Sequence, residues 1–229
     1  MFEEVKKLRA SDQVAGAIRD RILSGEIEPG TRLPPERDLA AQLGVNRTTV
    51  REALRSLEQL EIVSIRHGGG VTVLDPARAG LQVLPFLLTL GGRVDPDLLA
   101  NFLEVRRIIG GAIVRLAAER AGPEDIVNLE AALAPITALA ESDEPHSPDE
   151  LGALDLQFFL ALAAAGRNRV FRFLLHALRS IYRGEAPLFR MLFADARRVA
   201  TSHSDVVNAL RNRDGDLAVR LIEKYLSHN

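Results

Sequence analysis

The sequence contains no cysteine and no tryptophan among its 229 residues. Without cysteine the chain has no disulfide, no thiolate metal ligand and no thiol nucleophile. This composition suits a reducing compartment, and we expect a cytoplasmic protein. Aromatic residues make up only 5% of the chain and hydrophobic residues 47%. Leucine, alanine, valine and isoleucine must therefore fill the core.

Long apolar runs are missing as well. No apolar run follows the start of the chain, which argues against a secretory signal. The longest apolar stretch, residues 83–90, is too short to cross a bilayer, so we expect no contact with a membrane. The formal net charge of −2 argues against a chain that coats nucleic acid through its overall charge, but it leaves room for a local basic face.

Residue patterning predicts a mainly α-helical fold with two domains. Residues 1–75 combine short helices with a β-hairpin, residues 76–95 form a linker with an apolar helical segment, and residues 96–229 form an all-α bundle. Within the bundle we expect helices at about 96–120, 123–141, 148–165, 168–183, 187–212 (broken) and 214–227.

The first domain carries the spacing of a helix-turn-helix. Ser11 is the expected cap of a first helix, and a second helix follows Pro34 and Pro35. Gly44 ends that helix and Asn46 caps the next one. Residues 62–66 and 71–74 then alternate in polarity around a glycine-rich tip, which predicts a β-hairpin beside the helices, the wing of a winged helix.

The helix that follows Asn46 places arginines on its outward side. Arg47, Arg51 and Arg55 are each four residues apart, with Thr48 beside them. Arginine can bind phosphates and the acceptor edge of guanine. The alternative is a solvated face with ordinary surface arginines. We favour a DNA-binding face, because the cap, the turn and the hairpin surround the same row.

Two motifs in this domain resemble those of the GntR superfamily of transcription regulators: residues 29–40 (PGTRLPPERDLA) and 44–54 (GVNRTTVREAL). The resemblance implies a homodimer that binds a palindromic operator in double-stranded DNA. Positions matching the DNA contacts of this family are Arg37, Arg47, Thr48, Arg51, His67 and Gly68, and we add Asn46 and Thr49 from the same helix start.

Four polar residues of the second domain lie on otherwise apolar helical stripes: Arg106, Asp155, His203 and Tyr225. Buried charge is costly unless it is paired, so a shared pocket would explain all four. One interpretation is a structural Arg106–Asp155 pair with a satisfied core histidine. The other, which we favour, is an effector pocket in which Arg106 binds an anionic group.

Two further alternatives have less support. In a helical-bundle enzyme, Asp155, His203 and Tyr225 would be acid–base residues. However, the sequence has no Ser/His/Asp ordering, phosphate loop or metal motif, so we expect no enzyme. A DNA-binding architectural protein without a ligand would have a filled core around Arg106.

Short segments of the second domain resemble the FadR subfamily of the same superfamily, namely 103–107, 116–120, 155–159, 165–168 and 213–218. The resemblance implies an all-helical effector domain with Arg106, Asp155, Phe159, His203 and Tyr225 in the effector site. The candidate effectors are an acyl-CoA, a fatty acid and a small carboxylate. Many relatives hold a divalent metal there with one Asp and three His. Since Phe159 and Tyr225 stand at two of those positions, we expect no metal and no cofactor.

Overall fold

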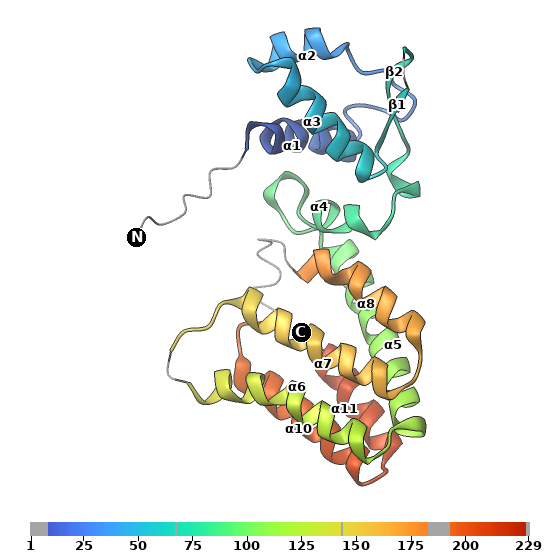
Figure 1. The fold of residues 1–229 in the computed structure, drawn as a ribbon, viewed down its shortest axis with the longest axis vertical. Coiled ribbons are helices and arrows are strands. Elements are labelled where there is room, and N and C mark those ends of the chain that lie inside the picture. Colours follow the sequence, from blue (N-terminus) through green and yellow to red (C-terminus); the bar gives the residue numbers. More distant parts are fainter. Residues whose placement is uncertain (1–8, 67, 143, 183–192, 228–229) are drawn as a thin grey trace. The chain divides into compact units, whose positions relative to one another are not determined.

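The computed structural model describes residues 9–66, 68–142, 144–182 and 193–227. The chain divides into two compact units, Met1–Arg93 and Val94–Asn229, and each is described by itself (Figure 1). Within the described ranges, we find no helix that is both long enough and apolar enough to span a membrane.

The N-terminal unit contains the expected helix-turn-helix. Its helices are α1 (Ala10–Leu23), α2 (Glu36–Leu43) and α3 (Arg47–Gln59). Helix α1 already begins at Ala10, so Ser11 lies in its first turn and the expected Ser11 cap is wrong. Gly44 ends α2 with φ +66°, a conformation that glycine adopts without steric cost. Asn46 caps α3, as expected, by accepting a hydrogen bond from the Thr49 backbone N–H at 2.8 Å.

The wing is an antiparallel hairpin of β1 (Val63–Arg66) and β2 (Gly70–Val73), with Val63 opposite Val73. Residues 30–33 pair with the other edge of β2. There the Val73 N–H donates to the Thr31 carbonyl and the Leu33 N–H donates to the Val71 carbonyl, both at 2.9 Å. No pattern in the sequence predicted this third segment, which joins the wing to the chain that leads into α2.

The apolar face of α3 forms the centre of the N-terminal core, with Val50, Ala53, Leu54 and Leu57 all buried. Residues 76–93, most of the segment 76–95 that we expected to be a linker, belong to this unit. They comprise the short 3-10 turns Pro76–Arg78, Leu81–Val83 and Leu90–Gly92 and helix α4 (Leu84–Leu88). Val83 is buried in the core, and the Arg19 guanidinium of α1 lies 3.8 Å from the centroid of the Phe86 ring.

The C-terminal unit is a helical bundle of α5 (Pro96–Arg120), α6 (Pro123–Glu141), α7 (Pro148–Ala165), α8 (Arg169–Tyr182), α10 (Ala196–Arg211) and α11 (Gly215–Ser227). Helix α5 packs against α7 and α11, helix α10 against α6 and α11, and helix α7 against α6 and α8. These helices agree with the expected ranges. The part of the expected broken helix between 187 and 192 lies outside the described residues.

Close packing between α5 and α11 depends on Gly110. A Cβ atom added there would overlap the side chain of Leu226 in α11 and would lie 3.4 Å from the Phe159 ring of α7. Leu226 is fully buried, so it has little space into which it can move. By contrast, an added Cβ at Gly16 in α1 meets no atom closer than 3.7 Å.

We therefore expect the substitutions Gly110→Ala and Gly16→Ala to change stability in opposite directions. Alanine is the better helix former at both positions, which stabilises by about 0.5–1 kcal/mol. At Gly110 the overpacking outweighs this gain and leaves a net loss of about 1 kcal/mol. Urea denaturation followed by circular dichroism measures both. Equal stabilisation by the two substitutions would contradict the close helix contact.

Candidate functional sites

Helix α3 separates its buried apolar face from an exposed basic face. Arg47, Arg51 and Arg55 are all exposed, and the apolar residues that alternate with them are buried. Asn46 positions the first of these arginines, because its cap fixes where the helix starts. The structure thus presents the three guanidinium groups along one side of α3, as the spacing predicted.

An ion pair joins the middle of this row to the start of α2. Arg51 donates from Nε to Glu36 Oε1 at 3.1 Å and from Nη2 to Glu36 Oε2 at 2.7 Å. The hydrogen bond from Arg51 and the nearby charges of Arg47 and Arg55 hold the pKa of Glu36 below its usual value. The same pair raises the pKa of Arg51. This carboxylate is therefore ionised and sits within the field of all three arginines.

The other residues expected to contact DNA lie around this face. Arg37 in α2 is exposed, and its Nε donates to Asp38 at 3.0 Å. Thr48 is exposed at the start of α3, whereas Thr49 is half-buried and its backbone N–H is used by the Asn46 cap. Gly68 is exposed near the tip of the hairpin with φ +71°. His67 lies outside the described residues.

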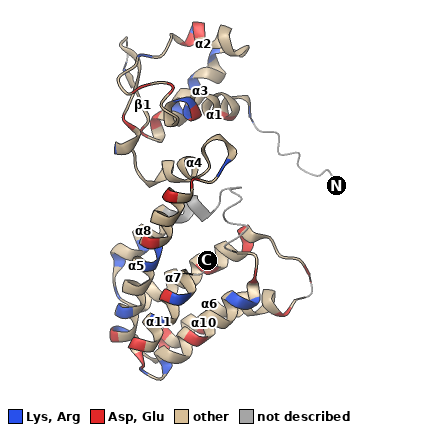
Figure 2. Cartoon of the chain, turned by 180° about the vertical axis from the view of Figure 1, so that it is seen from behind, with Lys and Arg blue, Asp and Glu red and all other residues tan. Residues whose placement is uncertain are grey.

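A groove of about 1030 Å³ runs between α3 and the wing. Its basic lining comes from Arg32, Arg51, Arg55 and Arg66. Sequence analysis did not name Arg32 or Arg66 as site residues. The pairing of residues 30–33 with β2 brings Arg32 to the wing, and no short-range pattern signals that pairing. Basic and acidic residues are interspersed along the chain (Figure 2). The groove is rich in positive charge because the fold brings these four arginines to its walls.

The C-terminal unit holds a buried polar cluster centred on Asp155 of α7. Its Oδ1 accepts hydrogen bonds from His203 Nε2 of α10 at 2.9 Å and from the Tyr225 hydroxyl of α11 at 2.7 Å. Its Oδ2 accepts a hydrogen bond from Arg106 Nη2 of α5 at 3.2 Å. Asp155 and His203 are fully buried, and Arg106 is 6% exposed. One carboxylate thus joins four helices.

Burial alone raises the pKa of Asp155, but the hydrogen bonds and charges of His203, Arg106 and Tyr225 outweigh it and lower that pKa overall. The His203 ring stacks on Phe158 with centroids 4.1 Å apart. Its Nδ1 atom is buried without a hydrogen-bond partner among the described residues. The histidine is therefore fixed in orientation through Nε2 and through stacking.

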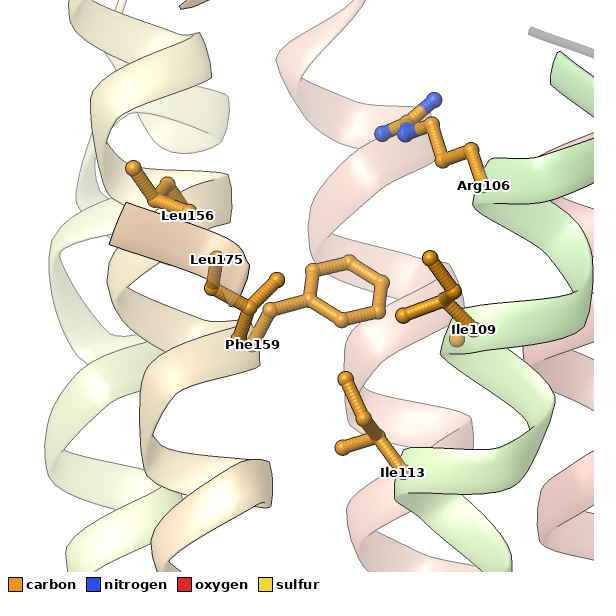
Figure 3. A pocket seen from close by; sticks show the side chains of 7 residues that line it. Arg106, Ile109, Ile113, Leu156, Phe159 and Leu175 are labelled. Atoms are coloured by element: carbon orange, nitrogen blue, oxygen red, sulfur yellow. The ribbon is translucent and has the colours of Figure 1, made fainter. Parts of the chain in front are cut away.

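Beside this cluster lies a cavity of about 20 Å³, lined by Arg106, Ile109, Gly110, Ile113, Leu156, Phe159 and Leu175 (Figure 3). The Phe159 ring points across it toward Ile109 and Ile113 of α5. The volume is close to that of one water molecule. Of the five expected effector residues, Arg106 and Phe159 line the cavity. Asp155, His203 and Tyr225 do not line it: Asp155 pairs with Arg106, and His203 and Tyr225 donate hydrogen bonds to Asp155.

The side chains of this cluster do not fit a transition-metal ion. Asp155 and His203 are the two good ligands. Phe159 cannot ligate, and the neutral Tyr225 hydroxyl donates a hydrogen bond to Asp155. The Arg106 guanidinium, 3.2 Å from Asp155, would repel a divalent cation. Over the part of the chain that the structure describes, no group of three or more His, Cys, Asp or Glu side chains is placed to hold a metal.

Family models match both units. Residues 10–73 match the model for bacterial regulatory proteins of the gntR family, and residues 101–228 match the FCD domain. The chain belongs to the GntR family. It is a helix-turn-helix transcription regulator with a C-terminal effector-binding domain of the FCD type, which confirms the fold and function expected from the sequence. The family consists of regulators, so the proteins that resemble this chain give the enzyme alternative no support.

Individual proteins agree with this assignment. The chain is 34% identical to a helix-turn-helix transcriptional regulator of Mycobacterium tuberculosis, over 99% of this chain and 90% of that protein. It is 31% identical to the fatty acid metabolism regulator protein of Enterobacter sp., over 72% of this chain and 66% of that protein. The solved structure of Lar, which controls the agr system of Listeria monocytogenes, shares the fold. Its TM-score is 0.64 at 18% identity, with 98% of this chain and 95% of that chain covered.

We expect the substitution Asp155→Asn to destabilise the GntR-family chain by about 3 kcal/mol at neutral pH, because it leaves the buried Arg106 charge without its carboxylate. The pKa of Asp155 is lowered in the folded state, so its contribution is present at neutral pH and is lost as the pH falls through that folded value. The stability difference between the wild type and the variant should therefore shrink as the pH falls below about 4.

Thermal unfolding across this pH range is the measurement, and Asp205→Asn, at an exposed position of α10, is the control. If the stability difference between the wild type and Asp155→Asn stays constant down to acidic pH, the charge of Asp155 contributes nothing to folding stability.

Proposed function

We propose that the chain binds a palindromic operator as a homodimer, with α3 in the major groove and the wing beside it. The exposed arginine row opposite the buried stripe of α3 supports this proposal most directly. A helix of this kind fits the major groove, and arginine is suited to guanine and to phosphate. Arg47 and Thr48, at the first turn of α3, are the residues proposed to reach the duplex first.

The surrounding residues are proposed to fix the protein on the backbone of the duplex. Arg37 lies at the start of α2, and Arg32 and Arg66 line the groove next to the wing. Contacts to phosphate set the register and orientation, whereas contacts to base edges carry the sequence information. Gly68 and Gly69 in the tip have no side chain that would prevent entry into a groove.

Replacing Arg47 by Ala should weaken binding to an operator duplex by at least about fivefold, because a bidentate base contact contributes about 1–3 kcal/mol. Arg21→Ala in α1 is the control, since Arg21 is also exposed but lies on another helix and pairs with Glu26. Fluorescence anisotropy with a duplex obtained by in vitro selection measures both. Equal affinities of the two variants would contradict the proposed face.

The effector proposed for the FCD domain is an organic anion with an apolar part. Arg106 would pair with the anionic group, and the apolar lining of the cavity would receive the rest of the molecule. A cavity of about 20 Å³ is too small for such a ligand. The bound state therefore requires the lining side chains to move, and this difference between two states is what a switch needs.

The similarity to a fatty acid metabolism regulator makes fatty acids and acyl-CoA thioesters the first candidates to test, with small carboxylates as the other class. Effector binding would change the mobility or spacing of the two winged helices of the dimer and thereby the operator affinity. The size of that change is limited by the difference in effector affinity between the two states.

A thermal-shift screen should find an acid or acyl-CoA that raises the melting temperature. The substitution Arg106→Lys should weaken the binding of that ligand by at least tenfold. Lysine keeps the positive charge near Asp155 but lacks the planar guanidinium that pairs with an anionic group through two hydrogen bonds. DNA binding without effector should stay unchanged. Arg107→Lys, on the exposed side of α5, is the control. A full response in Arg106→Lys would exclude Arg106 from the effector site.

A further inference from the structure

We propose that Glu36 is a positioning residue that orients Arg51 for base recognition and thereby increases the discrimination between operator and other DNA. The inference rests on the proposed function, because it assigns a role to a residue that lines the groove of the proposed DNA-binding face. Glu36 belongs to α2 and would act through Arg51, 15 residues later in α3.

The geometry leaves one edge of the Arg51 guanidinium without a bond to Glu36, on a side chain that is 55% exposed. A guanidinium has five N–H donors. Glu36 accepts from Nε at 3.1 Å and from Nη2 at 2.7 Å, so both carboxylate oxygens hold the same edge of the fork. The remaining donors, on Nη1 and the other side of Nη2, form the end of the side chain. Two neighbouring N–H groups of this kind match the O6 and N7 acceptors of guanine.

The two hydrogen bonds to Glu36 fix the orientation of the Arg51 guanidinium before DNA binds, and this restricts what Arg51 can bind. A free arginine side chain can rotate toward any nearby phosphate, whereas a guanidinium held by two hydrogen bonds donates in one direction. The carboxylate also offsets the charge of Arg51 and repels phosphate, which reduces attraction to DNA of any sequence. Over the described residues, Arg47 and Arg55 form no salt bridge, so the arginine at the centre of the row differs from its two neighbours.

A purely structural role for the pair has little support. The Arg51 side chain is 55% exposed and the Glu36 side chain 33% exposed. Ion pairs in such positions contribute little to folding stability. Glu36 at the first turn of α2 also interacts favourably with the helix dipole, but that effect does not require contact with Arg51.

The test compares Glu36→Gln with the wild type on two duplexes of about 30 base pairs, roughly three helical turns. One duplex is selected in vitro with the wild-type chain, and the other is a scrambled sequence of the same composition. We expect the ratio of the two affinities to fall about tenfold in the variant. The salt dependence on the scrambled duplex should become steeper by about one ion, because Arg51 is now free to neutralise a phosphate.

Three further variants separate positioning from charge. Glu52→Gln removes the same charge from an exposed position next to Arg51 and should leave the affinity ratio within about twofold of the wild type. Glu36→Asp keeps the charge but shortens the side chain, so the ratio of the two affinities should fall while the salt dependence on the scrambled duplex stays as in the wild type. In an Arg51→Lys background, Glu36→Gln should have no further effect on the ratio, because no fork remains to be oriented.

A Glu36→Gln protein with an unchanged affinity ratio would overturn the proposal, as would an equal loss in Glu52→Gln. Melting temperatures of all variants should match that of the wild type. If Glu36→Gln unfolds, Glu36→Asp provides the test, and an unchanged affinity ratio in that variant would overturn the proposal. A wild-type chain that prefers no selected duplex would contradict the proposed function itself, which is a different outcome from the failure of Glu36 alone.

Discussion

The carboxylate of Asp155 is the constraint on which the C-terminal unit depends. A fully buried charge is tolerated only when its hydrogen-bonding capacity and its charge are both met. Arg106, His203 and Tyr225 meet them from three different helices, so α5, α10 and α11 are fixed relative to α7. The polar cluster adds directional contacts to the apolar packing around it, and it fixes Arg106 at the edge of the cavity.

The N-terminal unit meets a similar requirement on its surface. Helix α3 must bury an apolar stripe and still leave three arginines accessible, and a helical repeat satisfies both needs within one segment. The cap at Asn46 and the turn at Gly44 fix where that segment begins. Glu36 then distinguishes Arg51 from the arginines on either side. Charge placement, and not overall charge, gives this face its properties, since the whole chain has a net charge of −2.

Sequence patterns predicted the features that depend on neighbouring residues. The helices expected at 96–120, 123–141 and 148–165 are found as α5, α6 and α7, each of which begins at a proline. The glycine-rich tip predicted the wing. Features that join distant residues were missed. The pairing of residues 30–33 with β2 and the Glu36–Arg51 bond depend on tertiary contacts that no local pattern encodes. Apolar stripes singled out Arg106, Asp155, His203 and Tyr225. They could not show that His203 and Tyr225 share one oxygen of the Asp155 carboxylate.

The small cavity beside Arg106 bears on how the proposed effector would act. A ligand shifts an equilibrium between two states only as far as its affinity for them differs. Because Phe159 and the isoleucines of α5 leave about 20 Å³ beside Arg106, the proposed effector would have to displace them to reach the guanidinium. Such a displacement would act on α5 and α7, the two helices that the Arg106–Asp155 ion pair joins. That ion pair lies where the proposed anionic effector would compete with it.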